Sequence, residues 1–104
     1  MSNRIEKIFT MLASQPNDNF LRHALALEYK KLGQLADAEA LFTAILTDTP
    51  SYVGSYYHLA KLLEQQQRTD EAIHWYEKGM EAAKAAGDKH AYSELQMAYE
   101  DLTY

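Results

Sequence analysis

The sequence predicts an all-α fold built from antiparallel helical hairpins, and three observations support this prediction. Only 4 glycines and 2 prolines occur among 104 residues, whereas a β-sandwich or barrel needs such turn residues about every 8 to 12 positions. Apolar residues recur at helical spacing between these breakers. The pattern of apolar residues also repeats at an offset of 34 residues. A chain of 104 residues is expected to form one domain.

The first two expected helices are separated by a proline. The first covers Ser2 to Ala13, with apolar residues at helical spacing, and Pro16 ends it. Asn17 or Asp18 can cap the second helix. This helix ends before Gly33, because a glycine suits the left-handed position just past a helix C-terminus.

The third and fourth expected helices flank the second proline. The third runs from Leu35 to Thr47 or Asp48, because the residue that precedes Pro50 is pushed out of the α region. Ser51 is expected to cap the fourth helix, which runs to about Gln66.

The last two expected helices are separated by a glycine. Thr69 is expected to cap the fifth, which runs to Ala85, and Gly87 followed by Asp88 repeats the signal of a helix end and a new cap. Connections of a few residues make consecutive helices antiparallel neighbours. The sixth helix carries one apolar face, formed by Ala91, Leu95, Ala98, Tyr99 and Leu102.

Two stretches of the chain match each other in the 34-residue register. Leu25-Ala26-x2-Tyr29 corresponds to Leu59-Ala60-x2-Leu63, and Ala38-x3-Phe42 corresponds to Ala72-x3-Tyr76. Both stretches resemble the tetratricopeptide repeat, a helix-turn-helix unit with the pattern W-x2-L-G-x2-Y, A-x3-F, P. The chain departs from that pattern at Arg22, Gln67 and Lys84, where the family has an aromatic residue, a turn glycine and a proline.

The resemblance implies a single domain over residues 1–104, a right-handed α-α superhelix similar to small stand-alone bacterial proteins of this family. About three units are needed to bury the apolar faces of such repeats, so the outer segments are expected to act as caps. The expected parts are an N-terminal capping half-repeat (2–14), a first repeat (19–52), a second repeat (53–86) and a C-terminal capping helix (88–104).

In the family, the first helix of each hairpin lines a concave groove that holds an extended peptide or a helix. The mixture of aromatic, cationic and neutral groups on the corresponding face here suits a protein partner with some negative charge. The residues expected to line the groove are His23, Leu27 and Lys30 of the first repeat, Tyr57, His58, Lys61 and Glu64 of the second, and Tyr92, Leu95 and Tyr99 of the cap helix.

One known ligand type of the family is not expected. The two-carboxylate clamp of chaperone-binding relatives needs lysine, asparagine and arginine, and none of the matching positions carries the required residue. Those positions hold His23, Leu27, His58, Asp88 and Tyr92.

Composition and charge exclude several classes of function. Acidic residues (15) outnumber basic ones (10), so the basic footprint of a nucleic-acid-binding protein is missing. The chain has no cysteine, which removes thiolate chemistry and fits a reducing compartment. No apolar run approaches the roughly 18 residues of a membrane span, and the first residues lack the signal-peptide pattern. We therefore expect a cytoplasmic protein that binds neither nucleic acid nor membrane.

No constellation of catalytic or metal-ligating residues stands out. No two of the 4 histidines have the i,i+4 spacing that puts a pair on one helix face. The serines lack the G-x-S-x-G turn of hydrolases, and the scattered glycines form no phosphate-binding loop. The sequence therefore predicts no enzyme activity, no cofactor and no metal site.

Two hypotheses about function remain. In the first, the protein is an adaptor that binds a peptide or a helix of a partner in the groove. In the second, it is a structural homodimer in which two copies bury their end helices or grooves against each other. Light scattering distinguishes them, because a stable monomer disfavours obligate assembly.

Overall fold

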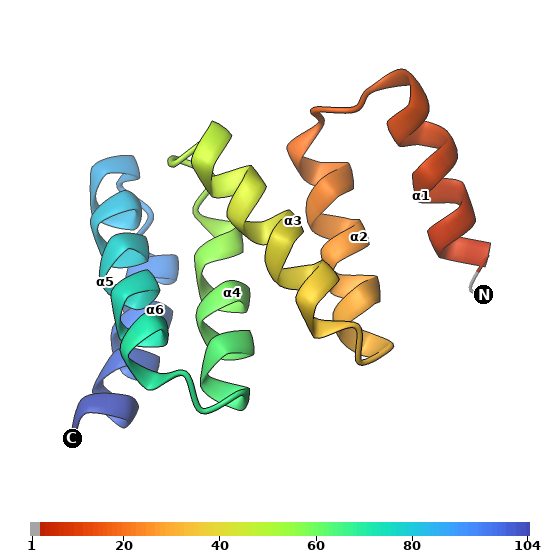
Figure 1. Cartoon of the computed structure of the whole chain (residues 1–104). Coiled ribbons are helices and arrows are strands. Elements are labelled where there is room, and N and C mark those ends of the chain that lie inside the picture. Colours follow the sequence, from red (N-terminus) through yellow and green to blue (C-terminus); the bar gives the residue numbers. More distant parts are fainter. Residues whose placement is uncertain (1–2) are drawn as a thin grey trace.

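A computed structural model of the chain describes residues 3–104, and within this range it consists of six α-helices without any strand (Figure 1). The all-α prediction is confirmed. Ser2, the expected start of the first helix, lies outside the described residues. The helices are α1 (Asn3–Ser14), α2 (Asn19–Lys31), α3 (Leu35–Asp48), α4 (Gly54–Gln65), α5 (Thr69–Ala86) and α6 (Lys89–Thr103).

Consecutive helices pack side by side as antiparallel neighbours. The pairs α2–α3 and α4–α5 form two hairpins, and α3 contacts α4 where the hairpins meet. At one end of the array α1 packs against α2, and at the other end α6 packs along α5 and also contacts α4 (Figure 1). The outer helix α1 therefore packs against the outer side of the first hairpin, and α6 packs against the outer side of the second.

Small side chains allow the helices to approach closely. Ala26, Ala38, Ala60 and Ala72, the small positions of the repeat, are all fully buried. At Gly79 of α5 the neighbouring helix is so near that an added Cβ atom would stand 2.7 Å from the Cβ of Tyr56. The rings of Phe42 and Tyr76, which belong to the same pattern, fill the space beside the alanines. Both rings are fully buried.

The turns after α2, α4 and α5 share one backbone geometry. Gly33, Gln67 and Gly87 have φ angles of 78°, 60° and 71°, all in the left-handed region. In each turn the next amide donates to a carbonyl five residues back, as Arg68 N does to Leu63 O at 3.0 Å. Gln67, which stands where the family has a turn glycine, therefore adopts the backbone conformation of that glycine.

Two of the four predicted helix caps are present. Asp18 accepts a hydrogen bond from the Leu21 amide at 2.9 Å, and Asp88 accepts one from the Ala91 amide at 3.0 Å. The predictions for Ser51 and Thr69 are wrong. Ser51 lies in a turn that delays the start of α4 to Gly54, and the left-handed turn before α5 leaves Thr69 already inside the helix.

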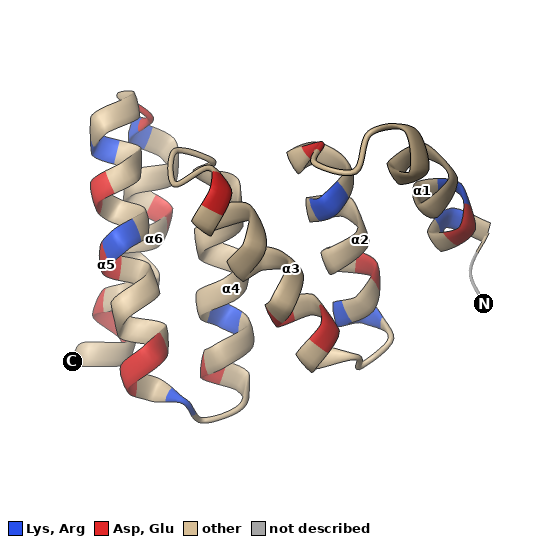
Figure 2. Cartoon of the chain, turned by 45° about the horizontal axis from the view of Figure 1, so that its top comes forward, with Lys and Arg blue, Asp and Glu red and all other residues tan. Residues whose placement is uncertain are grey.

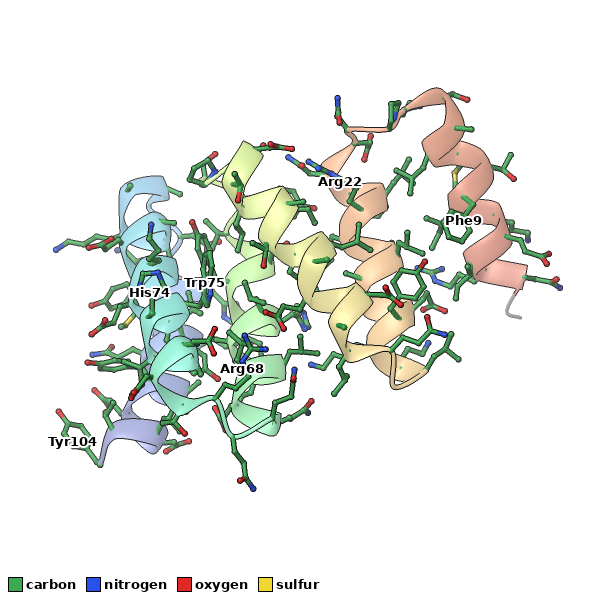
Figure 3. The ribbon with its side chains drawn as sticks, in the orientation of Figure 1. Phe9, Arg22, Arg68, His74, Trp75 and Tyr104 are labelled. Carbon is green, nitrogen blue, oxygen red and sulfur yellow. The ribbon has the colours of Figure 1, made fainter. Side chains whose placement is uncertain are left out.

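Arg22 explains how the first repeat tolerates a charge at the aromatic position of the pattern. The residue is 8% exposed at the N-terminal end of α2 (Figure 3). Its guanidinium donates to Asp48 Oδ2 at 3.0 Å and to Asn19 Oδ1 at 2.6 Å. The arginine thus ties the start of α2 to the end of α3, while its aliphatic stem supplies the packing.

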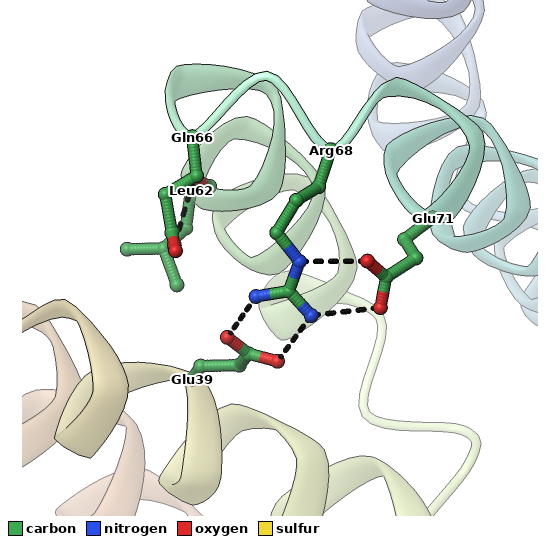
Figure 4. Close-up of polar contacts among 5 residues, drawn as sticks. All are labelled: Glu39, Leu62, Gln66, Arg68 and Glu71. Atoms are coloured by element: carbon green, nitrogen blue, oxygen red, sulfur yellow. Dashed lines mark hydrogen bonds and ion pairs between the residues drawn. The ribbon is translucent and has the colours of Figure 1, made fainter.

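Arg68 joins the second hairpin to the first. Its guanidinium donates two hydrogen bonds to Glu39 of α3, at 2.6 and 3.0 Å, and two to Glu71 of α5, at 2.6 and 2.7 Å (Figure 4). Bidentate pairs of this kind fix relative orientation better than single contacts do. The turn between α4 and α5 is thereby held against α3.

Replacing Gln67 with glycine should stabilise the protein or leave its stability unchanged. A residue with a Cβ pays about 1 kcal/mol in the left-handed region, and the extra freedom of glycine in the unfolded chain offsets about half of the gain or more. The measurement is the free energy of unfolding in urea. The reverse change, Gly33→Gln, should cost about 1 kcal/mol. A loss of more than about 1 kcal/mol in Gln67→Gly would mean that the glutamine side chain makes a contact that the fold requires.

Candidate functional site

Seven of the predicted groove residues lie on two neighbouring helices. The His23 ring of α2 is 5.3 Å from the His58 ring of α4, and both rings pack on buried Phe42 of α3 at 5.5 and 6.1 Å. Leu27 and Lys30 follow His23 at helical spacing, so they share its side of α2. We call this surface the α2–α4 face, and it consists of His23, Leu27, Lys30, Tyr57, His58, Lys61 and Glu64.

Both histidines of the α2–α4 face are held in the neutral form. His23 Nδ1 lies 2.8 Å from Oγ of Ser55, a fully buried serine on α4. Burial, followed by the charge of the neighbouring His58, lowers the pKa of His23 to about 4. Burial, followed by the charge of Lys30, also lowers the pKa of His58. At pH 7 the two rings therefore add aromatic surface rather than charge.

Tyr57, Lys61 and Glu64 form a connected group on α4. The Lys61 ammonium lies 5.7 Å from the centroid of the Tyr57 ring and 3.7 Å from Glu64 Oε2. The Tyr76 hydroxyl donates to Glu64 Oε1 at 3.0 Å, and the Tyr76 ring is 6.5 Å from that of Tyr57. These contacts hold the side chains in place before any ligand binds.

Lys30 completes the face from the side of α2. Its side chain is half-buried, and the pKa of its ammonium is lowered first by burial and then by the positive charge of Lys61. Lys30 and Lys61 come from different repeats. Figure 2 shows basic positions on α2 and on α4, and acidic positions along α5. A chain with a net charge of −5 thus places two cations close together here.

The three groove residues predicted on α6 do not join this surface. Leu95 is 1% exposed and packs beside Gly79 of α5, so its assignment to the groove is wrong. Tyr99 donates to Glu77 Oε2 of α5 at 3.1 Å, and Tyr92 borders a shallow surface hollow with residues of α5. All three residues thus lie against α5, along which α6 packs.

Sequence reasoning missed the residues that support the α2–α4 face from below. Ser55 is fully buried beneath His23, and Tyr76 orients Glu64 from α5. Nothing in the sequence distinguishes Ser55 from an ordinary residue near a helix start. The position of Tyr76 in the repeat pattern correctly indicated burial but gave no sign of the hydrogen bond to Glu64.

The described residues include neither a cluster of metal-ligating side chains nor a membrane-spanning helix. No group of three or more histidine, aspartate or glutamate side chains within residues 3–104 could hold a metal ion. None of the helices in that range is both long and apolar enough to cross a membrane.

Comparisons with known proteins agree with the repeat pattern. The family model described as tetratricopeptide repeat matches residues 23–89. The comparison with curated proteins gave no match.

Several solved structures resemble the whole array. A tetratricopeptide repeat domain protein from Salinibacter ruber is 45% identical, with a TM-score of 0.81 over 84% of this chain and 88% of that one. A protein from Bordetella parapertussis is 29% identical, with a TM-score of 0.84 over 99% and 90% of the two chains. The first such domain of Spaghetti (RPAP3), solved bound to an HSP90 peptide, is 22% identical, with a TM-score of 0.74 over 96% and 78%. The helices and these likenesses confirm the predicted solenoid of helical hairpins.

Acidification from pH 7 to 5 should lower the stability of the protein. The folded-state pKa of His23, about 4, lies below the ordinary value of 6.5, so the unfolded chain takes up a proton first as the pH falls through 6.5. After allowance for partial exposure, this contribution is about 1 kcal/mol at pH 5. The measurement is the urea midpoint as a function of pH.

His23→Asn removes this titration, and its amide oxygen can still accept a hydrogen bond from Ser55. We expect this variant to lose less stability than the wild type between pH 7 and 5. His90→Asn is the matched control, because His90 is exposed on α6. Equal pH dependence in the wild type and in His23→Asn would contradict the prediction.

Proposed function

Because the chain belongs to the tetratricopeptide repeat family, we propose that its α2–α4 face is a non-catalytic interaction surface that binds a peptide or a helix of a partner protein. The observation that carries this proposal is the convergence of half-buried aromatic, imidazole and ammonium groups from two repeats on one surface. Tyrosine, the residue type of Tyr57, is among those that most often carry the binding energy of protein interfaces.

The surface is also organised before a partner arrives. Tyr57 is held between Lys61 and Tyr76, and His23 is held by Ser55. Side chains that are already ordered lose little entropy on binding, so more of the contact energy contributes to affinity. Leu27 and the Tyr57 ring supply apolar area, while Lys30 and Lys61 supply charge that selects between partners.

The proposed partner is not a chaperone tail held in a two-carboxylate clamp. The Spaghetti domain was solved with an HSP90 peptide, but an identity of 22% supports a common fold alone. At the clamp positions this chain carries His23, Leu27 and His58 on the α2–α4 face, and none of these side chains is the required lysine, asparagine or arginine.

The proposed setting is the bacterial cytoplasm. The resemblance to proteins of Salinibacter ruber and Bordetella parapertussis supports a bacterial protein. The absence of cysteine fits a reducing compartment. No catalytic role is proposed for the α2–α4 face, because its two histidines lie against aromatic rings and a buried serine instead of a carboxylate that could orient them for catalysis.

Self-association is the second candidate function. Large apolar side chains are exposed near both ends of the array, with Phe20 72% exposed on α2 and Met97 67% exposed on α6. Such side chains favour contacts between copies when they are grouped. Light scattering at micromolar concentration distinguishes the candidates, because a monomer would exclude an obligate homodimer.

The partner-binding proposal is tested by selecting peptides from a random phage-displayed library against the full chain. We expect the wild type to select peptides whose binding is lost in Tyr57→Ala/Lys61→Ala. The half-buried Tyr57 ring contacts Tyr76, so the variant should also lose about 1 kcal/mol of stability while remaining helical by circular dichroism.

Tyr92→Ala is the matched control, because it removes a half-buried tyrosine on α6, away from the α2–α4 face. The control should bind the selected peptides as the wild type does. Peptides that bind the Tyr57 variant and the wild type equally well would show that the partner uses another surface.

A further inference from the structure

Lys30 differs from every other basic residue that the structure describes. Arg22, Lys61 and Arg68 are also largely or partly buried, and each lies within 4.0 Å of a carboxylate. Lys30 is half-buried but makes no ion pair with any residue in the range 3–104. The other lysines without an acidic partner are exposed, so water solvates their charge. These exposed lysines are Lys7, Lys78, Lys84 and Lys89.

The positive charge of Lys61 makes the position of Lys30 less favourable. Lys61 of the neighbouring repeat is close enough for its positive charge to act on Lys30, and burial removes part of the water that would screen the two charges. A partly desolvated pair of like charges is unfavourable unless an anion lies between them. The chain has 15 acidic residues, yet within the described range none of them pairs with Lys30.

We infer that Lys30 and Lys61 together form a subsite for a carboxylate side chain of the bound partner, so that the partner segment carries aspartate or glutamate where it crosses from α2 to α4. This inference rests on the proposed function. It specifies that the partner carries an acidic side chain. The two lysines stand at positions other than those of the two-carboxylate clamp.

The surroundings of the two lysines limit the subsite on each side. On one side lie Leu27 and the Tyr57 ring, which suit an apolar residue next to the acidic one in the partner. On the other side Glu64 lies 3.7 Å from Lys61 and repels a second acidic residue at that end. The partner segment therefore combines an acidic residue with an apolar neighbour, and a uniformly acidic run does not fit.

The test uses the full chain and the random phage-displayed peptide library. We compare three proteins by sequencing the selected peptides: the wild type, Lys30→Glu/Lys61→Glu, and the control Lys78→Glu/Lys84→Glu. The control makes the same change in net charge at two exposed positions of α5. The wild type and the control should both enrich aspartate and glutamate over the input library, whereas the charge-reversed variant should lose this enrichment and favour lysine and arginine.

A second measurement covers the case in which charge reversal disturbs folding. Lys30→Gln/Lys61→Gln removes both charges but keeps uncharged polar side chains at the two positions, and circular dichroism reports whether the variant is folded. A synthetic acidic peptide chosen from the selection should bind this variant about tenfold more weakly than the wild type in fluorescence polarisation. The binding of that peptide to the wild type should also weaken as the salt concentration rises.

The outcomes separate this inference from the proposed function. Selected peptides that lose binding in Tyr57→Ala/Lys61→Ala but show no acidic enrichment would overturn the carboxylate subsite and leave the proposed function standing. An acidic enrichment that persists unchanged in Lys30→Glu/Lys61→Glu would overturn it as well. If the wild type selects no peptide, or if the selected peptides bind Tyr57→Ala/Lys61→Ala equally well, the proposed function fails and the inference fails with it.

Discussion

The close approach of neighbouring helices is the constraint on which the rest of the structure depends. Four alanines of the repeat are fully buried, and at Gly79 the backbone of α5 leaves no room for a Cβ atom beside Tyr56. Because the backbones come together at these small residues, Phe42 and Tyr76 can fill the remaining space without voids. The left-handed turns after α2, α4 and α5 then return the chain along the preceding helix, and the rings of His23 on α2 and His58 on α4 come to lie 5.3 Å apart.

The candidate site is a consequence of this packing across the boundary between two repeats. His23 and His58 meet over Phe42, and Lys30 approaches Lys61, although the members of each pair are more than 30 positions apart in the sequence. Neither hairpin alone would present two cations, an aromatic ring and two neutral imidazoles together. The surface that supports the proposed function thus exists only in the assembled array, which links the stability of the repeats to recognition.

Much of the fold was predictable, because glycines and prolines mark most of the helix ends, and the 34-residue register indicates the buried alanines and aligns Gln67 with the turn glycine Gly33. The prediction of groove residues failed where the exposure of a side chain depends on which helix packs against it. Leu95 is buried because α6 lies along α5, whereas the equivalent Lys61 remains on a surface. The bridge from Arg68 to Glu39 also escaped prediction, because it joins residues 29 positions apart that no local pattern connects.

The most direct test of the packing constraint is the stability of Gly79→Ala. Its Cβ would stand 2.7 Å from Tyr56 Cβ and 3.1 Å from Leu95 Cδ1, so the helices must move apart, at a cost of about 1 to 3 kcal/mol. Gly54→Ala is the matched control, because no atom lies within 4 Å of a Cβ at that helix start. We predict that urea unfolding shows a large loss for Gly79→Ala and none for Gly54→Ala. Wild-type stability in Gly79→Ala would contradict the claim that close helix approach determines the fold.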